Sequence, residues 1–167
     1  MNQFSDVLTA LNQLKADGIV ADYAIGGAMA VSFWDEPVAT QDLDVIVTLG
    51  GETAGLDPLR TVLDWLDGHG FAMQGEHAMI AGVPVQFLVA WTPLVAEAVS
   101  TAVEMPYDPD DPGSPAFRLI QPTYLVAMWL ADPGANTPRR RERAARLREA
   151  GLVDETLLAT LLSRVEP

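Results

Sequence analysis

The chain has 167 residues, of which 49% are hydrophobic and 20% charged, a composition that indicates one globular unit and excludes disordered and fibrous proteins. It contains no cysteine, which excludes disulfides, thiolate metal sites and cysteine nucleophiles and favours a reducing cytoplasm. The formal net charge of -13 opposes broad electrostatic binding of nucleic acid.

The first third of the chain predicts a helix, a strand, a glycine turn and a second helix. The N-terminal segment has no basic start and apolar run, so we expect no signal peptide, and no window approaches the roughly 20 apolar residues of a membrane span. Instead its apolar residues recur at helical spacing over residues 6–15. A short buried strand over 23–25 follows, then Gly26-Gly27, then a helix over 28–34.

The rest of the chain alternates between strands and helices before it becomes entirely helical. A central strand is predicted over 43–49, ended by Gly50-Gly51, and a helix is predicted to begin at Asp57-Pro58 and to end near Gly68. An antiparallel meander over 71–74, 77–81 and 83–89 is expected next, followed by a helix over 92–100. Two strands over 102–107 and 116–120 are expected on either side of a mobile turn-rich loop. The chain is expected to end in helices over 123–130, 139–150 and 154–164.

This pattern predicts an α/β (α+β) protein with a mixed, mostly antiparallel sheet, flanking helices and a helical C-terminal tail. We expect residues 1–121 to form the core and residues 122–167 to form a helical subdomain packed on it.

Two features between residues 25 and 47 point to chemistry. The glycine pair Gly26-Gly27 lies between a strand and a helix, where unpaired N–H groups and a partial positive charge suit a phosphate. Asp42 and Asp44 lie two residues apart at the start of a strand, so the pleat projects both carboxylates onto one face. Two such oxygen ligands select Mg2+ or Mn2+, which completes its shell with substrate phosphates and water.

A glycine turn, a short helix and a D-x-D strand together resemble the minimal nucleotidyltransferases of the DNA polymerase β superfamily. Within that superfamily the chain is most similar to the AbiEii-type abortive-infection and toxin–antitoxin branch. The segments GVPVQFLVAWTPLVAEAV, LIQPTYLVAMWL and RRRERAARLREAGLVD are similar to its later strands and C-terminal helices. The resemblance covers roughly residues 23–162.

The resemblance implies the nucleotidyltransferase fold and transfer of a nucleoside monophosphate from an NTP to an unidentified hydroxyl. Gly26 and Gly27 would hold the triphosphate, and Asp42 and Asp44 would bind the metal ions. The acceptor could be a nucleotide, RNA or a protein. The alternative is a catalytically degenerate member that only binds nucleotide or protein, and a third hypothesis is a role that depends on a partner protein of a two-gene toxin system.

The sequence departs from the family pattern at three places. Gln86 occupies the later strand where the family usually has a third carboxylate, and an amide cannot act as a base and is a poorer metal ligand. Gly27 stands where many members have serine. A lysine usual near Met128-Trp129 is missing, for which the segment from Arg139 to Arg143 could substitute.

Other polar and aromatic residues have ordinary structural interpretations beside functional ones. Six of the ten basic residues lie between Arg139 and Arg148, which predicts a solvated helix face paired with Glu142 and Glu149, or else the anion-attracting surface of the chain. His69 is expected at an exposed helix end, and His77 at a strand start or the mouth of a site. The four tryptophans, at positions 34, 65, 91 and 129, are expected in the core.

Overall fold

The computed structural model describes residues 3–50 and 57–165. Gly51, expected to end the central strand, lies outside the described residues. The first half of the described chain contains α1 (Gln3–Ala16), β1 (Asp22–Ile25), α2 (Gly27–Trp34), β2 (Leu43–Thr48), α3 (Arg60–Gly68), β3 (Met73–Gln74) and β4 (His77–Ile80). The second half contains β5 (Val83–Val89), α4 (Pro93–Ser100), β6 (Val103–Pro106), β7 (Ala116–Leu119), α5 (Pro122–Ala131), α6 (Pro138–Glu149) and α7 (Glu155–Ser163).

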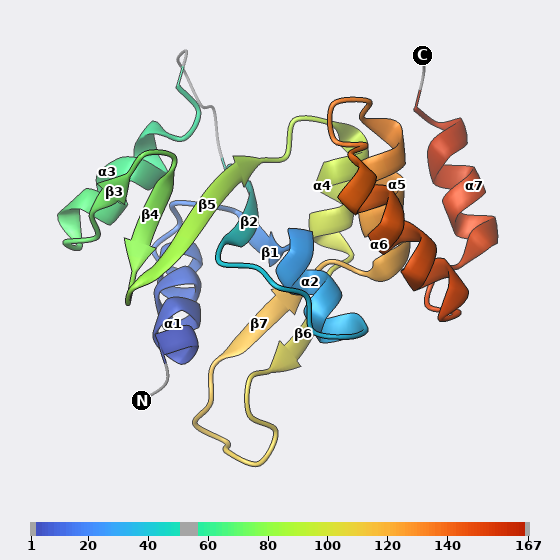
Figure 1. The fold of residues 1–167 in the computed structure, drawn as a ribbon. Helices are drawn as coiled ribbons and strands as arrows, with labels where there is room; N and C mark the ends of the chain where they lie inside the picture. Colours follow the sequence, from blue (N-terminus) through green and yellow to red (C-terminus); the bar gives the residue numbers. More distant parts are fainter. Residues whose placement is uncertain (1–2, 51–56, 166–167) are drawn as a thin grey trace.

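The strands form one mixed sheet in the order β3-β4-β5-β2-β1-β7-β6 (Figure 1). Among the described residues, β2 pairs with β5 and β1 with β7 in parallel, whereas the β1–β2, β3–β4, β4–β5 and β6–β7 pairs are antiparallel. The predicted mixed, mostly antiparallel sheet is therefore confirmed, with β2 in the middle. Short strands occupy both edges: β3 has two residues, and β6 ends at Pro106.

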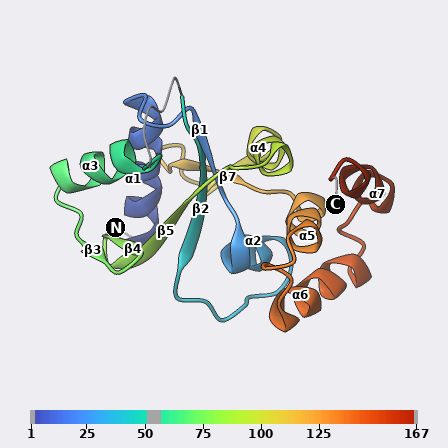
Figure 2. The same cartoon turned by 90° about the horizontal axis from the view of Figure 1, so that it is seen from above.

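Helices cover the two faces of this sheet (Figure 2). On one face α1 packs against β1, β4, β5 and β7, and α3 lies on the same side. On the other face α2 and α4 pack on the central strands, and α5 packs on both of these helices. Most of α5 is buried, because α2, α4, α6 and α7 pack around it.

Most predicted elements are found within a few residues of their expected bounds. One helix start is wrong: α3 begins at Arg60 rather than at Asp57-Pro58. The Asp57 carboxylate does not cap the helix but lies 3.6 Å from the Arg60 guanidinium, and Leu59 occupies the N-cap position. None of the helices in the described part of the chain has the length and apolarity to cross a lipid bilayer.

The predicted turn-rich loop joins β6 to β7 through a series of local hydrogen bonds. Asp108 N donates to Ser114 Oγ at 2.8 Å, and Gly113 N donates to Asp111 Oδ1 at 2.9 Å. Aspartate and serine side chains thus satisfy backbone donors that a loop of this composition would otherwise leave to water. The mobility expected of this loop stays a prediction.

Candidate nucleotide and metal site

The glycine turn joins the central sheet to the N-terminus of α2. Gly26 is the N-cap of α2 and makes no side-chain cap, so the first N–H groups of the helix remain available to an anion. Gly26 N itself donates to the backbone oxygen of Asp44 at 3.0 Å, which fixes the turn against β2. Gly27 has φ +61, in the left-handed region that favours glycine.

The Asp44 carboxylate lies directly against this turn. A Cβ atom built on Gly27 would overlap Asp44 Oδ2 and would lie 3.2 Å from Asp44 Cβ. Any side chain at position 27 would therefore have to displace the carboxylate. The sequence suggested glycine here only for backbone freedom; the structure adds that glycine makes room for Asp44.

The charge of Asp44 is only partly compensated in the described chain, where its carboxylate accepts no hydrogen bond. Burial raises the pKa of the Asp44 carboxyl above its ordinary value, and the nearby Asp42 charge reinforces that effect. The guanidinium of Arg140 acts in the opposite direction on the Asp44 pKa, as do His77 and Arg143. A half-buried carboxylate with this balance is a suitable ligand for a cation.

Asp42 lies just before β2 and contacts a residue whose role the sequence left open. Its Oδ2 is 3.3 Å from His77 Nε2, at the start of β4. His77 therefore lies at a strand start, as predicted, and also against one of the two site carboxylates. The adjacent Glu76 in the sequence was the only available signal, because the strand carrying His77 reaches Asp42 only through the sheet order β4-β5-β2.

Gln86 lies beside Asp44 on the neighbouring strand. The two residues are register partners in the parallel β2–β5 pair, so position 86 is where a carboxylate could approach Asp44. The Gln86 amide donates to Glu76 Oε2 at 3.4 Å. The described residues contain no group of three or more His, Cys, Asp or Glu side chains arranged to hold a metal ion.

The arginine-rich helix α6 contributes one residue to the same place. Arg140 lines the cavity that Asp44 and Gly27 also line, and its Nη1 donates to Ala135 O at 3.0 Å. Thr137 Oγ1 accepts from Arg140 N and thereby caps the helix that carries it. One guanidinium of the arginine segment therefore lines the same cavity as Asp44, while the substitution of this segment for the missing lysine stays a prediction.

Of the expected partners of this segment, Glu142 is a nearby charge that counteracts the lowering of the Arg143 pKa by burial, whereas the ion pairs of the described residues join α6 to other acids. In the described chain Arg146 pairs with Asp35 at 3.4 Å and with Glu36 at 2.6 Å, and Arg148 makes two hydrogen bonds of 2.8 Å to Glu155. These partners come from other elements because α6 folds back toward α2 and α7, which sequence spacing alone does not reveal.

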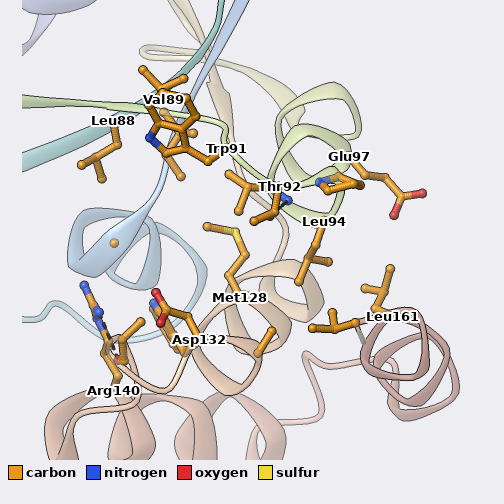
Figure 3. A pocket seen from close by; sticks show the side chains of 18 of the residues that line it. Leu88, Val89, Trp91, Thr92, Leu94, Glu97, Met128, Asp132, Arg140 and Leu161 are labelled. Atoms are coloured by element: carbon orange, nitrogen blue, oxygen red, sulfur yellow. Dashed lines mark hydrogen bonds between the residues drawn. The ribbon is translucent and has the colours of Figure 1, made fainter. Parts of the chain in front are cut away.

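A cavity of about 920 Å³ extends from Gly27, Asp44 and Arg140 along β5, α4, α5 and α7 (Figure 3). Trp91 lies at this cavity and is 73% exposed, so its predicted place in the core is wrong. It stands in the connection between β5 and α4, just before Pro93, and such connections lie on the surface. That position was the sequence signal for an exposed ring. Trp129 is buried, as predicted.

A scan against protein-family models and a search of curated proteins gave no match. Among solved structures, the chain is similar to an antigenic nucleotidyltransferase-like protein from Paracoccidioides brasiliensis. The TM-score is 0.53 at 16% identity, over 86% of this chain and 74% of that chain. The chain has the nucleotidyltransferase fold. At this identity the likeness establishes the fold and not the chemistry.

Two structures of the antibiotic-resistance factor ANT(2'')-Ia are also similar. A solution structure gives a TM-score of 0.48 at 16% identity, over 98% of this chain and 91% of that one. A crystal structure in complex with adenylyl-2''-tobramycin gives 0.49 at 16% identity, over 97% and 96%. These scores are too low to carry an argument about this chain.

Within the nucleotidyltransferase fold of this chain, the cavity brings together a glycine of the turn, a carboxylate and a guanidinium: Gly27, Asp44 and Arg140. Gly26 is joined to them through its bond to Asp44, and Gln86 through its register with Asp44. Asp42 does not line the cavity. It lies just before the first residue of β2, in contact with His77 at the first residue of β4.

Proposed function

We propose that this protein transfers a nucleoside monophosphate from a nucleoside triphosphate to a hydroxyl group, with release of pyrophosphate. The observation that carries the proposal is the backbone of Gly27 lying against the Asp44 carboxylate, at the N-terminus of α2. A phosphate bound by the open N–H groups of α2 would then lie beside a carboxylate that can share a cation with it.

The residues present fit a magnesium or manganese ion. Mg2+ is usually held in proteins by one or two carboxylates together with substrate phosphates and water, and Asp42 and Asp44 supply two. Burial disfavours the ionised form of Asp44, so a cation would stabilise the charge that the described chain compensates only in part. When bound, such an ion would neutralise charge on the triphosphate.

The chain's own groups would bind and orient the phosphates. The N–H groups at the start of α2, beyond Gly26 and Gly27, would fix the phosphate position, because their direction is set by the helix. Arg140 would add a permanent positive charge on the opposite side of the cavity from the sheet, where it could pair with phosphate oxygens.

The test is transfer of label from α-labelled NTPs in the presence of Mg2+ or Mn2+ to a panel of hydroxyl acceptors. Asp42→Asn and Asp44→Asn should abolish transfer. Arg140→Ala should weaken triphosphate binding about 10–100-fold, the effect of losing a hydrogen bond to a charged group. Arg141 is an exposed arginine on the same helix, and Arg141→Ala is the matched control, which should change neither nucleotide transfer nor triphosphate binding. Equal effects of the two arginine variants would contradict the role of Arg140.

A second candidate is a nucleotidyltransferase fold that binds nucleotide without transferring it. Gln86 favours this candidate, because the register partner of Asp44 is an amide that cannot take a proton from a hydroxyl. Calorimetry with ATP and Mg2+ separates the two: binding without transfer supports the binding module. Gain of transfer in Gln86→Glu, with unchanged ATP affinity, would identify the missing group.

The absence of cysteine favours a cytoplasmic setting, and the AbiEii resemblance suggests a protein partner from a toxin–antitoxin pair. Co-expression with the product of the adjacent gene, followed by size-exclusion chromatography, tests it. Co-elution at a fixed stoichiometry would support the pairing, and independent elution would count against it.

A further inference from the structure

The cavity at the proposed site is much larger than its polar end. Gly27, Asp44 and Arg140 lie at one end, next to α2, whereas the remainder runs between β5, α4, α5 and α7. Its volume of about 920 Å³ falls near the upper end of the roughly 300–1,000 Å³ that drug-sized ligands occupy. The cavity therefore has room for a second small molecule beside a nucleotide.

Apolar side chains line this larger part. Figure 3 shows Met128 near its centre, Leu88 and Trp91 on the side of the strand, and Leu94 facing Leu161 at the far end. Trp91 is 73% exposed and Leu88 39% exposed, although burial of their apolar surface would be favourable. Large apolar groups that remain exposed around a concave surface mark ligand-binding sites more often than monomer surface.

Two carboxylates of the larger part have partners of their own. Glu97 pairs with Arg164 at 3.5 Å, and Asp132 accepts a hydrogen bond from Gly134 N at 2.9 Å. Asp44 and Arg140 belong to the phosphate end. A polynucleotide is unfavourable, since the chain as a whole carries a net charge of -13. The same charge attracts cations in general, so the choice of an uncharged acceptor follows from the apolar lining and not from the charge.

We propose that the acceptor is a small, uncharged molecule with a flat apolar ring system and a hydroxyl group, and that its rings stack on Trp91 and enter the cavity toward Leu94. This inference rests on the proposed function. The acceptor hydroxyl oxygen forms a bond to the α-phosphorus, and the bond from that phosphorus to the β-phosphate oxygen breaks. Pyrophosphate leaves with the bonding electron pair, and the hydroxyl proton passes to water.

Binding of 2-naphthol, an uncharged ring system with one hydroxyl, tests the acceptor class without requiring turnover. Calorimetry on the full chain should detect 2-naphthol and should detect no binding of tobramycin as a polycationic comparison. Trp91→Ala should weaken 2-naphthol binding about tenfold, the scale of one ring stacked on an aromatic side chain. The exposed position of Trp91 makes this variant compatible with folding.

Two exposed strand residues provide a variant and its matched control for the role of the apolar side chains that line the cavity. Leu88→Glu places a charge in the cavity and should weaken 2-naphthol binding, whereas Val103→Glu, at a residue of similar exposure outside the cavity lining, should not. Equal effects of the two variants would overturn the proposal. So would binding of tobramycin in preference to 2-naphthol, or binding of neither.

A competition experiment shows whether the apolar side chains of the cavity bind the acceptor ring or the nucleobase. A saturating ATP analogue with a methylene group between the α- and β-phosphates, which cannot release pyrophosphate, should leave 2-naphthol binding unchanged in the presence of Mg2+. Competitive displacement would assign the apolar side chains to the nucleobase and overturn the proposal. The wild type and Trp91→Ala should elute at the same molecular mass, because a dimer lost in the variant would mean that a second copy covers these apolar side chains. If 2-naphthol binds as described but no nucleotide is transferred to it or to other acceptors, the proposed function fails and the ring-binding site stands.

Discussion

Replacing Gly27 with alanine separates backbone strain from the close approach of Asp44. An L-residue in the left-handed region costs about 1–2 kcal/mol, of which about 0.4–1 kcal/mol is offset by lower entropy of the unfolded chain. At Gly27 the new methyl group would also overlap the Asp44 carboxylate, and crowding of this kind costs about 1–3 kcal/mol more.

Gly18→Ala is the control for this substitution. Gly18 has φ +74, similar to Gly27, but an added Cβ there meets nothing within 4 Å. Since 1 kcal/mol shifts the melting temperature of a chain of this size by about 2–4 °C, Gly27→Ala should melt about 2–12 °C below Gly18→Ala. Differential scanning calorimetry at pH 7 measures the difference.

The two variants are then compared with Asp44→Ala added to each. Removing the carboxylate takes away the atoms that the new methyl group would meet first, so most of the difference should vanish. Gly27→Ala should also bind ATP with Mg2+ more weakly than Gly18→Ala does. Equal melting temperatures for the two single variants, or a difference that Asp44→Ala leaves intact, would refute the close approach.

Three further substitutions probe other contacts. Without metal, Asp44→Asn should have a higher melting temperature than the wild type at pH 7. The pKa of Asp44 is raised in the folded state, so the wild type loses stability as the pH rises from the unfolded pKa to the folded pKa of this carboxyl. The difference in melting temperature should disappear at pH 3, and a difference independent of pH would be inconsistent with this cause. Thr137→Ala removes the cap of α6 and should lower the free energy of unfolding, measured by urea titration, by about 1 kcal/mol. An unchanged free energy of unfolding would mean that water replaces the cap. Trp34→Phe removes the 2.7 Å bond from the indole to Ile120 O and should cost about 1–3 kcal/mol by the same method, whereas a neutral result would mean that the carbonyl finds another donor.

The order and type of the elements could be predicted because local signals agree with the fold. An apolar, β-branched run ended by glycines locates β2, short runs separated by glycines locate β4 and β5, and the glycine pair locates the start of α2. The start of α3 was wrong because Asp57 is a good cap by composition but pairs with Arg60 instead. Local chemistry favoured both arrangements, and only the tertiary structure decided between them.

The site was predictable only where its residues are close in sequence. Gly27 and Asp44 are joined by a short helix and strand, so their proximity follows from the motif. The contact of His77 with Asp42 depends on the sheet order, and the position of Arg140 depends on how α6 folds back. The apolar part of the cavity is assembled from four elements spread over the second half of the chain, and no sequence pattern specifies such a surface.

The two outer strands limit how other chains can attach to this protein. A two-residue strand offers almost no free backbone row for pairing, and a strand that ends in proline lacks a donor at that end. Glu104 adds a charge to the edge strand β6. Growth of the sheet by an added strand, as in fibrils or in strand-exchange complexes, is therefore disfavoured at both sides. A companion protein would have to recognise side chains on the helices rather than extend the backbone ladder.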